Sequence, residues 1–193
     1  MRIVEKAQLM SAPEIDRTLR RLAHQIVEKS GGTKHLALIG IRRRGVPLAQ
    51  RIAQAMRGID GVDVPVGTLD ITLYRDDLSK VAPHAVLQSS DITFGVDQMD
   101  LVLVDDVLYT GRTIRAAMNG LFDLGRPKRV RMCVLIDRGH RELPIEATFI
   151  GRKITTADTE IVEVRLHEID KEERVMLVDR VADSAGAGSG GKI

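Results

Sequence analysis

Runs of apolar residues recur along the chain and predict strands that are buried on both faces. They occupy residues 36–41, 101–104 and 130–136, the last interrupted only by Arg131. After the first two runs, apolar residues recur every three or four positions, which is typical of an amphipathic helix. A chain that alternates buried strands with such helices favours an α/β fold with a mostly parallel central sheet flanked by helices.

Further elements precede and follow this alternating core. A helix is expected to begin at Ser11, where Ser11 and Glu14 form a capping-box signal, and to end near Glu28. The other segments predict short strands, and the last two of them predict a hairpin. They are residues 3–9, 62–73, 147–151, 160–164 and 174–178.

Two carboxylates are expected at the end of the strand at 101–104, and a helix start follows them. Asp105 and Asp106 can accept hydrogen bonds from two adjacent sugar hydroxyls or lie near a bound metal. At residues 110–113, the free N–H groups of a first helical turn suit a phosphate, and Gly111 allows close approach. A sugar phosphate with a vicinal diol satisfies both halves of this stretch. The sequence contains neither a Walker A pattern nor a dinucleotide-binding glycine pattern.

Basic side chains follow the two neighbouring predicted strands. Because the carboxyl ends of parallel strands meet at one edge of a sheet, we expect these side chains near the two carboxylates. After the strand at 36–41, the basic cluster precedes Gly45 and favours an anion site. The residues are Arg42, Arg43 and Arg44 after one strand, and Arg138, His140 and Arg141 after the other.

The first predicted helix carries a basic stripe opposite its apolar one. A solvated helix face explains such a stripe routinely. Basic residues spaced along one face also suit the phosphate backbone of a nucleic acid, and we favour that interpretation. The stripe consists of Arg17, Arg20, Arg21 and His24.

Composition bounds the class of protein. At 193 residues and a net charge of +2, the chain fits one domain and is no polycation, so nucleic-acid binding requires a local basic patch. The single cysteine, Cys133, lies in an apolar run and is expected in the core, without a disulfide. No apolar run approaches the length of a membrane span and no secretory core opens the chain. We therefore expect a cytoplasmic protein that does not enter a membrane.

Two segments lack hydrophobic periodicity. Residues 74–91 form a long polar insertion, which in a compact domain is either functional or disordered. Residues 183–193 are rich in Gly, Ser and Ala and are expected to be a flexible tail.

Three motifs resemble one protein family. Residues 105–113 resemble the phosphoribosyl pyrophosphate (PRPP) motif of type I phosphoribosyltransferases. The motif reads Asp105-Asp106-Val107-Leu108-Tyr109-Thr110-Gly111-Arg112-Thr113. Its Leu-Tyr pair, with the strings at 71–77 and 137–145, resembles the PyrR family of pyrimidine operon regulators that are also uracil phosphoribosyltransferases. The resemblance implies one domain at 1–182, with a small hood from about 137–180 plus the N-terminal segment.

The resemblance also implies a reaction, uracil + PRPP → UMP + pyrophosphate. Mg²⁺ is expected as a cofactor carried by PRPP or pyrophosphate rather than by protein ligands. The loop that closes over PRPP is expected within 74–91, with Arg75 joining Asp105 and Asp106 as catalytic groups. The loop at 42–45 is expected to bind pyrophosphate and often carries a cis non-proline peptide in this fold. Substrate contacts are expected from Arg43, Arg44, Asp105, Asp106, Val107, Leu108, Tyr109, Thr110, Gly111, Arg112, Thr113, Arg138 and Val162.

For the regulatory role, the resemblance implies that UMP or UTP in the same pocket favours binding to the leader of pyrimidine operon mRNA. RNA contacts are expected from Arg17, Arg20, Arg21, His24, His140, Arg141, Arg152 and Lys153. The family suggests a homodimer or a larger homo-oligomer. Two alternatives stay open: a salvage enzyme without an RNA role, or a phosphoribosyltransferase for another base such as hypoxanthine or orotate.

Overall fold

A computed structural model describes residues 2–72 and 90–181. Strands and helices alternate through the middle of the chain, as the apolar runs predict. The elements are β1 (Arg2–Ser11), α1 (Ala12–Ser30), β2 (Leu36–Ile41), α2 (Gly45–Asp60), β3 (Val66–Leu69), β4 (Asp100–Leu108), α3 (Arg112–Phe122), β5 (Arg129–Asp137), β6 (Phe149–Lys153), β7 (Glu160–Arg165), α4 (His167–Asp170) and β8 (Arg174–Val181).

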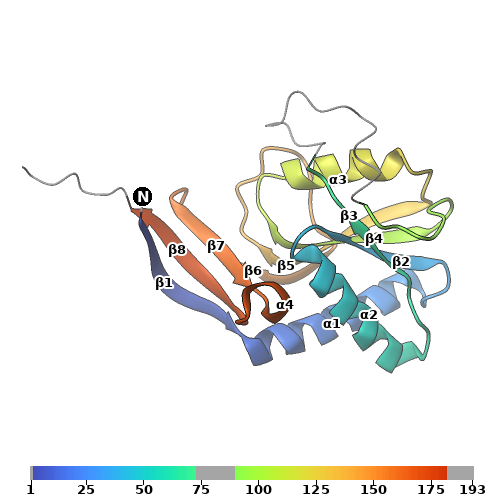
Figure 1. Cartoon of the computed structure of the whole chain (residues 1–193), viewed down its shortest axis with the longest axis horizontal. Coiled ribbons are helices and arrows are strands. Elements are labelled where there is room, and N and C mark those ends of the chain that lie inside the picture. Colours follow the sequence, from blue (N-terminus) through green and yellow to red (C-terminus); the bar gives the residue numbers. More distant parts are fainter. Residues whose placement is uncertain (1, 73–89, 182–193) are drawn as a thin grey trace, which may run out of the picture.

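The larger of two sheets has five strands in the order β3-β2-β4-β5-β6, and every neighbouring pair is parallel. In Figure 1, α3 covers one face of this sheet, and α1 and α2 cover the other. Successive residues of a strand point to opposite faces of the sheet, so the side chains on both faces are buried under helices. Leu38 packs in the cluster with α1 and α2, whereas its neighbour Ile39 packs in the cluster with α3. This two-sided burial explains the uninterrupted apolar runs.

The smaller sheet forms a hood beside the core, at the left of Figure 1. Its order is β1-β8-β7, and both pairs are antiparallel. The predicted hairpin is therefore confirmed, with α4 at its turn, and the first strand of the chain joins it. The hood sheet starts later than expected, however. The strand predicted at 147–151, within the range that the resemblance gave to the hood, is β6 and pairs with β5 in the core sheet.

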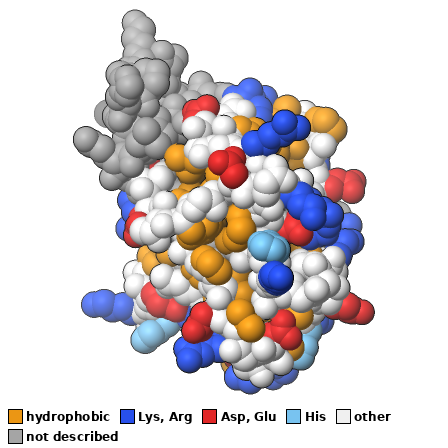
Figure 2. All heavy atoms as spheres, turned by 90° about the vertical axis from the view of Figure 1, so that its right-hand side faces the viewer, with side chains coloured by type: hydrophobic (Ala, Val, Ile, Leu, Met, Phe, Trp, Pro, Cys, Tyr) orange, Lys and Arg blue, Asp and Glu red, His pale blue; other side chains and the backbone are white. Residues whose placement is uncertain are grey.

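The surface turned away from the hood has no single sign of charge. Figure 2 shows basic and acidic side chains scattered around a central hydrophobic patch on this side.

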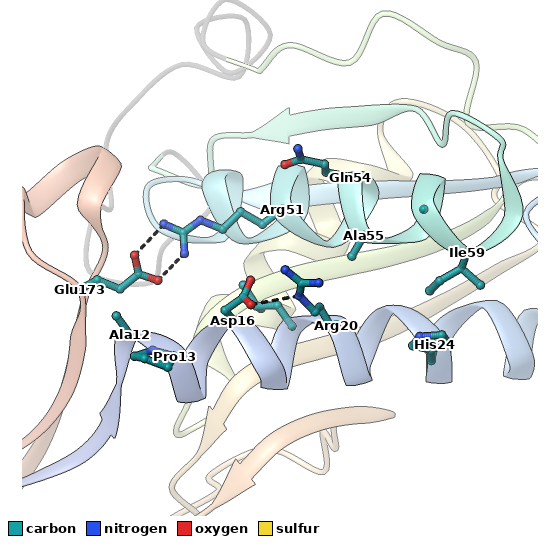
Figure 3. A pocket seen from close by; sticks show the side chains of 12 residues that line it. Ala12, Pro13, Asp16, Arg20, His24, Arg51, Gln54, Ala55, Ile59 and Glu173 are labelled. Atoms are coloured by element: carbon teal, nitrogen blue, oxygen red, sulfur yellow. Dashed lines mark hydrogen bonds and ion pairs between the residues drawn. The ribbon is translucent and has the colours of Figure 1, made fainter.

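Helices α1 and α2 lie side by side, and a groove of about 800 Å³ runs between them. Ion pairs sit along it: Asp16 binds Arg20, and Arg51 reaches Glu173 at the base of the hood (Figure 3). This groove lies on the helices and not at the strand ends, so it is separate from the predicted site. Across the described residues, no helix is both long and apolar enough to cross a membrane.

Candidate active site

The chain brings the predicted site together at the carboxyl edge of the core sheet. Strands β2 and β4 are neighbours, yet α2 and α3, which follow them, cover opposite faces. Such a reversal opens a crevice outside the strand ends, where ligands bind in open α/β sheets. The approach is close, because a Cβ on Gly45 would lie only 2.2 Å from the carbonyl oxygen of Val104. The start of α2 is therefore pressed against β4.

The two carboxylates lie inside β4 and not after its end. The strand continues to Leu108, since its parallel pairing with β5 extends to Leu108↔Asp137. Asp105 is 7% exposed, and its Oδ1 accepts a hydrogen bond from the N–H of Asp106 at 2.9 Å. Asp106 in turn accepts one from the N–H of Val107 at 2.9 Å. Both side chains are therefore held in fixed orientations.

Burial makes both carboxylates costly to ionise. It raises the pKa of Asp105 well above the usual range, and repulsion from Asp106 adds to the rise. Burial also raises the pKa of Asp106, while Asp105 and the positive charge of Arg44 oppose that rise. Hydroxyl donors or a cation placed between these groups would offset the cost. The pair therefore fits a ribose that becomes positively charged as it reacts.

The pKa of Asp105 leads to a stability prediction. When the pKa of a carboxyl is higher in the folded state than in the unfolded state, the protein is most stable at pH values below the unfolded-state pKa. Stability is then lost as the pH rises toward the folded-state pKa. We expect Asp105→Asn to have a higher melting temperature than wild type at pH 8. The increase should be about 2–4 °C for each kcal/mol of unfolding free energy that the substitution restores. The gain should shrink as the pH falls, because the wild-type carboxyl then takes up a proton and loses its charge. Calorimetry of both proteins across this range tests it, and an equal or lower melting temperature at pH 8 would refute it.

The predicted phosphate loop joins β4 to α3. Gly111 has a φ of 92°, a conformation that strains other residues, and α3 begins one residue later. Thr110 accepts hydrogen bonds at its carbonyl oxygen from the N–H groups of Glu142 and Leu143 at 3.0 and 3.1 Å. These two hydrogen bonds hold the predicted phosphate loop against the loop that follows β5. The N–H groups in the first turn of α3 have no acceptor within the helix and are suited to an anion.

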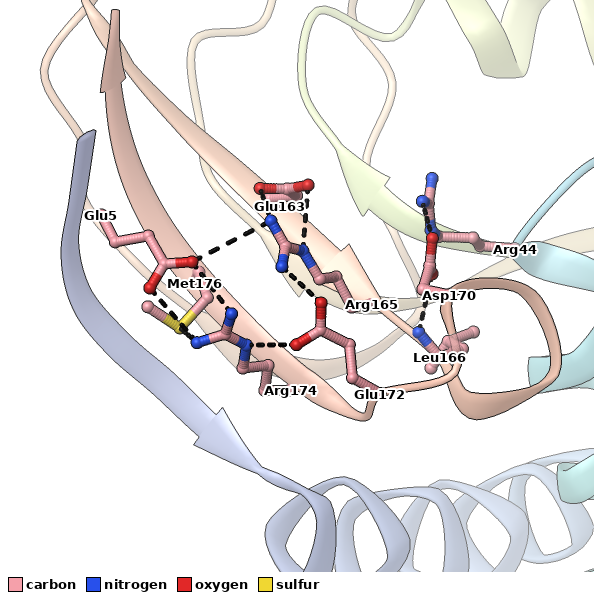
Figure 4. Close-up of polar contacts among 9 residues, drawn as sticks. All are labelled: Glu5, Arg44, Glu163, Arg165, Leu166, Asp170, Glu172, Arg174 and Met176. Carbon is pink, nitrogen blue, oxygen red and sulfur yellow. Dashed lines mark hydrogen bonds and ion pairs between the residues drawn. The ribbon is translucent and has the colours of Figure 1, made fainter. Parts of the chain in front are cut away.

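The arginine loop between β2 and α2 contains a cis peptide between Arg42 and Arg43, as the resemblance predicts. Arg43 is exposed. Arg44 instead reaches the hood, where Nε and Nη2 donate to the two oxygens of Asp170 at 3.2 and 2.8 Å (Figure 4). Asp170 also accepts from the N–H of Leu166 at 2.9 Å. A bidentate ion pair therefore joins the arginine loop to the hood, which the sequence pattern did not indicate.

Arg138 follows β5 and is 5% exposed. Its guanidinium carbon lies 4.0 Å from the centre of the Tyr109 ring, and its Nε donates to Thr156 Oγ1 at 3.3 Å. Its Nη2 is buried without a hydrogen-bond partner among the described residues. A buried donor of this kind costs about 1–3 kcal/mol until it finds an acceptor. Val162, the other residue expected near the base, is buried on β7.

Arg141 and Arg21, both expected to contact RNA, bind other parts of the chain. The guanidinium of Arg141 donates to the carbonyl oxygens of Tyr109 and Ile145 at 2.8 and 2.9 Å, and it pairs with Asp137 at 2.5 Å. Arg21 donates to the carbonyl oxygen of Gly151 at 2.5 Å. These arginines hold loops and elements together, a role that sequence reasoning missed because it depends on distant residues. Their contact with RNA stays a prediction.

The remaining predicted RNA residues differ in their surroundings. Arg20 pairs with Asp16 in the helix groove, which His24 also lines. Arg152 donates to the carbonyl oxygen of Leu9. Arg17 and Lys153 are exposed. The basic stripe of α1 is thus divided between the groove, solvent and β6.

Other predictions lie outside the described residues. They concern Arg75 as a catalytic group, most of the loop at 74–91, and the tail at 183–193.

Comparison with known proteins identifies the family. The model of the phosphoribosyl transferase domain matches residues 6–169. The chain is 55% identical over 175 residues to the bifunctional protein PyrR of Pelotomaculum thermopropionicum, covering 91% of this chain and 97% of that one. It is 54% identical over 175 residues to the bifunctional protein PyrR of Thermus thermophilus, with the same coverage of 91% and 97%.

Solved structures agree on the fold. A hypoxanthine-guanine phosphoribosyltransferase from Bacillus anthracis superposes with a TM-score of 0.70 at 19% identity, covering 93% of this chain and 100% of that one. The hypoxanthine phosphoribosyltransferase of Trypanosoma cruzi gives a TM-score of 0.68 at 17% identity, covering 91% and 97%. At such identity the likeness concerns the fold alone, which is the expected type I phosphoribosyltransferase fold. The chain therefore belongs to the phosphoribosyl transferase domain family and, within it, to the PyrR family of bifunctional proteins that its motifs indicated.

Proposed function

We propose that this protein transfers the phosphoribosyl group of PRPP to uracil, forming UMP and pyrophosphate, and also binds pyrimidine operon mRNA in response to UMP or UTP. One observation carries the catalytic half. Asp105, which is buried, and Asp106, which is half-buried, lie on β4 shortly before the N-terminus of α3, and the positive charge of Arg44 is nearby. A ribose 5-phosphate bearing a pyrophosphate at C1 satisfies all three features at once.

Each part of the crevice then has a role. The first turn of α3, with Thr110 and Thr113, holds the 5′-phosphate. Asp105 and Asp106 accept the ribose hydroxyls and stabilise positive charge on the ring as the bond from C1 to pyrophosphate breaks. N1 of uracil forms the new bond to C1, and its proton passes to the departing pyrophosphate or to solvent. Arg43 and Arg44 face the departing pyrophosphate, and Arg75, which lies outside the described residues, is expected to join them. Most of the rate gain comes from position and electrostatics.

Mg²⁺ belongs to this proposal as a partner of the substrate. The described residues contain no group of three or more His, Cys, Asp or Glu side chains able to hold a metal. The carboxylate oxygens of Asp105 and Asp106 are the hard donors that Mg²⁺ prefers, so they fit an ion brought by PRPP. When bound, the ion would neutralise charge on the leaving pyrophosphate.

The family supports uracil as the base, and the donor of Arg138 that is unpartnered within the described part of the chain is compatible with a base carbonyl. A pyrimidine carbonyl would satisfy Nη2, while the backbone of Val162 on β7 lies in the hood sheet expected to cover the base. The test is a PRPP-dependent assay with uracil, orotate and hypoxanthine in competition. Turnover with uracil supports the proposal. A preference for hypoxanthine or orotate would instead support a phosphoribosyltransferase for another base.

For the RNA half, the exposed face of α1 is the best candidate surface. Arg17 is exposed there, and Arg20 and His24 lie on the same helix. We expect Arg17→Glu to weaken binding to the pyrimidine operon leader by about tenfold, because it removes one phosphate contact and adds repulsion. Filter binding with a scrambled RNA as reference measures this. Arg17→Gln, which removes charge without adding repulsion, should show a smaller loss, and equal affinity in all three proteins would contradict the role.

Arg21 is less suitable for this test than its charge suggests. Its hydrogen bond to Gly151 holds α1 against β6, so reversing its charge would disturb packing as well as RNA binding. A cytoplasmic location and assembly into a homodimer or larger oligomer complete the proposal. Sedimentation at several protein concentrations tests the assembly.

A further inference from the structure

Four side chains form a closed ring of contacts beside the crevice. Arg138 stacks on Tyr109, and Tyr109 meets the ring of His140 edge to face, with centroids 5.9 Å apart and planes at 65°. His140 Nε2 lies 3.2 Å from Thr156 Oγ1, and Thr156 Oγ1 accepts from Arg138 Nε at 3.3 Å. We call these four residues, Arg138, Tyr109, His140 and Thr156, the aromatic ring cluster.

Tyr109 lies between the predicted phosphate loop and the side chain of Arg138. On the chain it immediately precedes Thr110, where the phosphate loop begins. Its ring packs against Arg138, whose Nη2 has no partner among the described residues and suits a base carbonyl. A molecule carrying both a base and a 5′-phosphate would therefore fix Tyr109 from two sides. Uracil alone or inorganic phosphate alone would act on one side only.

The far side of the cluster reaches a residue on the surface. His140 Nε2 donates to the carbonyl oxygen of Thr156 at 2.8 Å, and its Nδ1 lies 3.0 Å from a highly exposed carboxylate of Asp158. His140 also has a φ of 57°, which few residues other than Gly adopt, so its placement depends on these contacts. A change in the packing of Tyr109 would thus alter how His140 is presented to solvent.

We propose that Tyr109 couples nucleotide binding to RNA binding. A nucleotide bound beside Arg138 changes the packing of Tyr109, and this change alters how His140 is presented to solvent. The proposal rests on the proposed regulatory function and adds the residue through which it acts. Coupling of this kind is reciprocal: if UMP raises RNA affinity by a factor, RNA raises UMP affinity by the same factor. Tyr109 is a positioning residue here, since it acts through His140 and Arg138.

The experiment compares wild type, Tyr109→Phe and Tyr109→Leu by RNA binding to the pyrimidine operon leader, with and without saturating UMP. The saturating UMP concentration is found by a separate UMP titration of each variant. Altered UMP affinity then does not affect the ratio of RNA affinity with UMP to RNA affinity without it. We expect UMP to raise RNA affinity by about fivefold or more in wild type and in Tyr109→Phe, which keeps the ring. In Tyr109→Leu the ratio should fall to within about twofold of one.

Further measurements distinguish the ways in which the proposal could be wrong. Thr156→Val breaks the opposite side of the cluster and should also lower the ratio, which keeps the test decisive if Tyr109→Leu does not fold. Uracil and inorganic phosphate, added separately to wild type, should each raise RNA affinity less than UMP does. An undiminished ratio in the folded Tyr109→Leu and Thr156→Val proteins would overturn the coupling role. A wild-type ratio of one would instead overturn the regulatory half of the proposed function, and the coupling with it.

Discussion

Replacing Asp106 by asparagine is expected to lower turnover by about tenfold or more while the protein stays folded. The amide oxygen of the introduced side chain can still accept the hydrogen bond from the N–H of Val107, so the backbone of β4 should keep its geometry. What is lost is the negative charge that would face the ribose as it becomes cationic. Because burial makes that charge costly in the empty site, the variant should be at least as stable as wild type.

Steady-state kinetics with uracil and PRPP, beside thermal unfolding, test this prediction. The matched control is Asp63→Asn, which removes the same charge at a surface position where Asp63 is 76% exposed and pairs with Arg57. We expect the control to retain full turnover. Wild-type rates in Asp106→Asn would remove Asp106 from the catalytic groups, and a fall in melting temperature would show that its charge contributes to folding.

The sequence was sufficient for the parts of this fold that depend on local pattern. Residues 36–41 form β2 as predicted, because a strand buried on both faces leaves an uninterrupted apolar run. The expected helix start at Ser11 is confirmed, with the carboxylate of Glu14 accepting from the N–H of Ser11 at 2.8 Å. The hairpin of β7 and β8 is confirmed for the same reason, since each strand carries its own signal.

Pairings between distant residues were beyond the reach of such patterns. The carboxylates were placed after a strand ending at 104, whereas pairing with β5 extends β4 through them. Asp170 is the last residue of α4, and only the folded chain brings it to Arg44. Arg141 looked available for RNA, yet most of its donors bind carbonyl oxygens of neighbouring loops. A charged residue in a sequence does not reveal whether its partner is a ligand or the protein itself.

A methyl group at Gly45 is expected to damage both stability and activity. A Cβ there would lie 2.2 Å from the carbonyl oxygen of Val104 and 3.3 Å from Cα of Asp105, and neither backbone atom can move without shifting β4. The clash must push the start of α2 away from the strand and carry Arg44 with it. We expect Gly45→Ala to lose about 1–3 kcal/mol of stability, as overpacked cores do, and to lower turnover by about a hundredfold, as misplaced catalytic geometry does.

The same helix supplies the control. Gly58 lies in α2 with open space around it, so Gly58→Ala meets no atom within 4 Å. Because alanine is favoured over glycine inside a helix by about 1 kcal/mol, this variant should match or exceed wild-type stability with unchanged kinetics. Urea unfolding and PRPP kinetics of the two variants therefore distinguish a loss caused by close packing from one caused by an altered helix. If Gly45→Ala retained wild-type turnover, close contact between α2 and β4 would not be what positions the arginine loop.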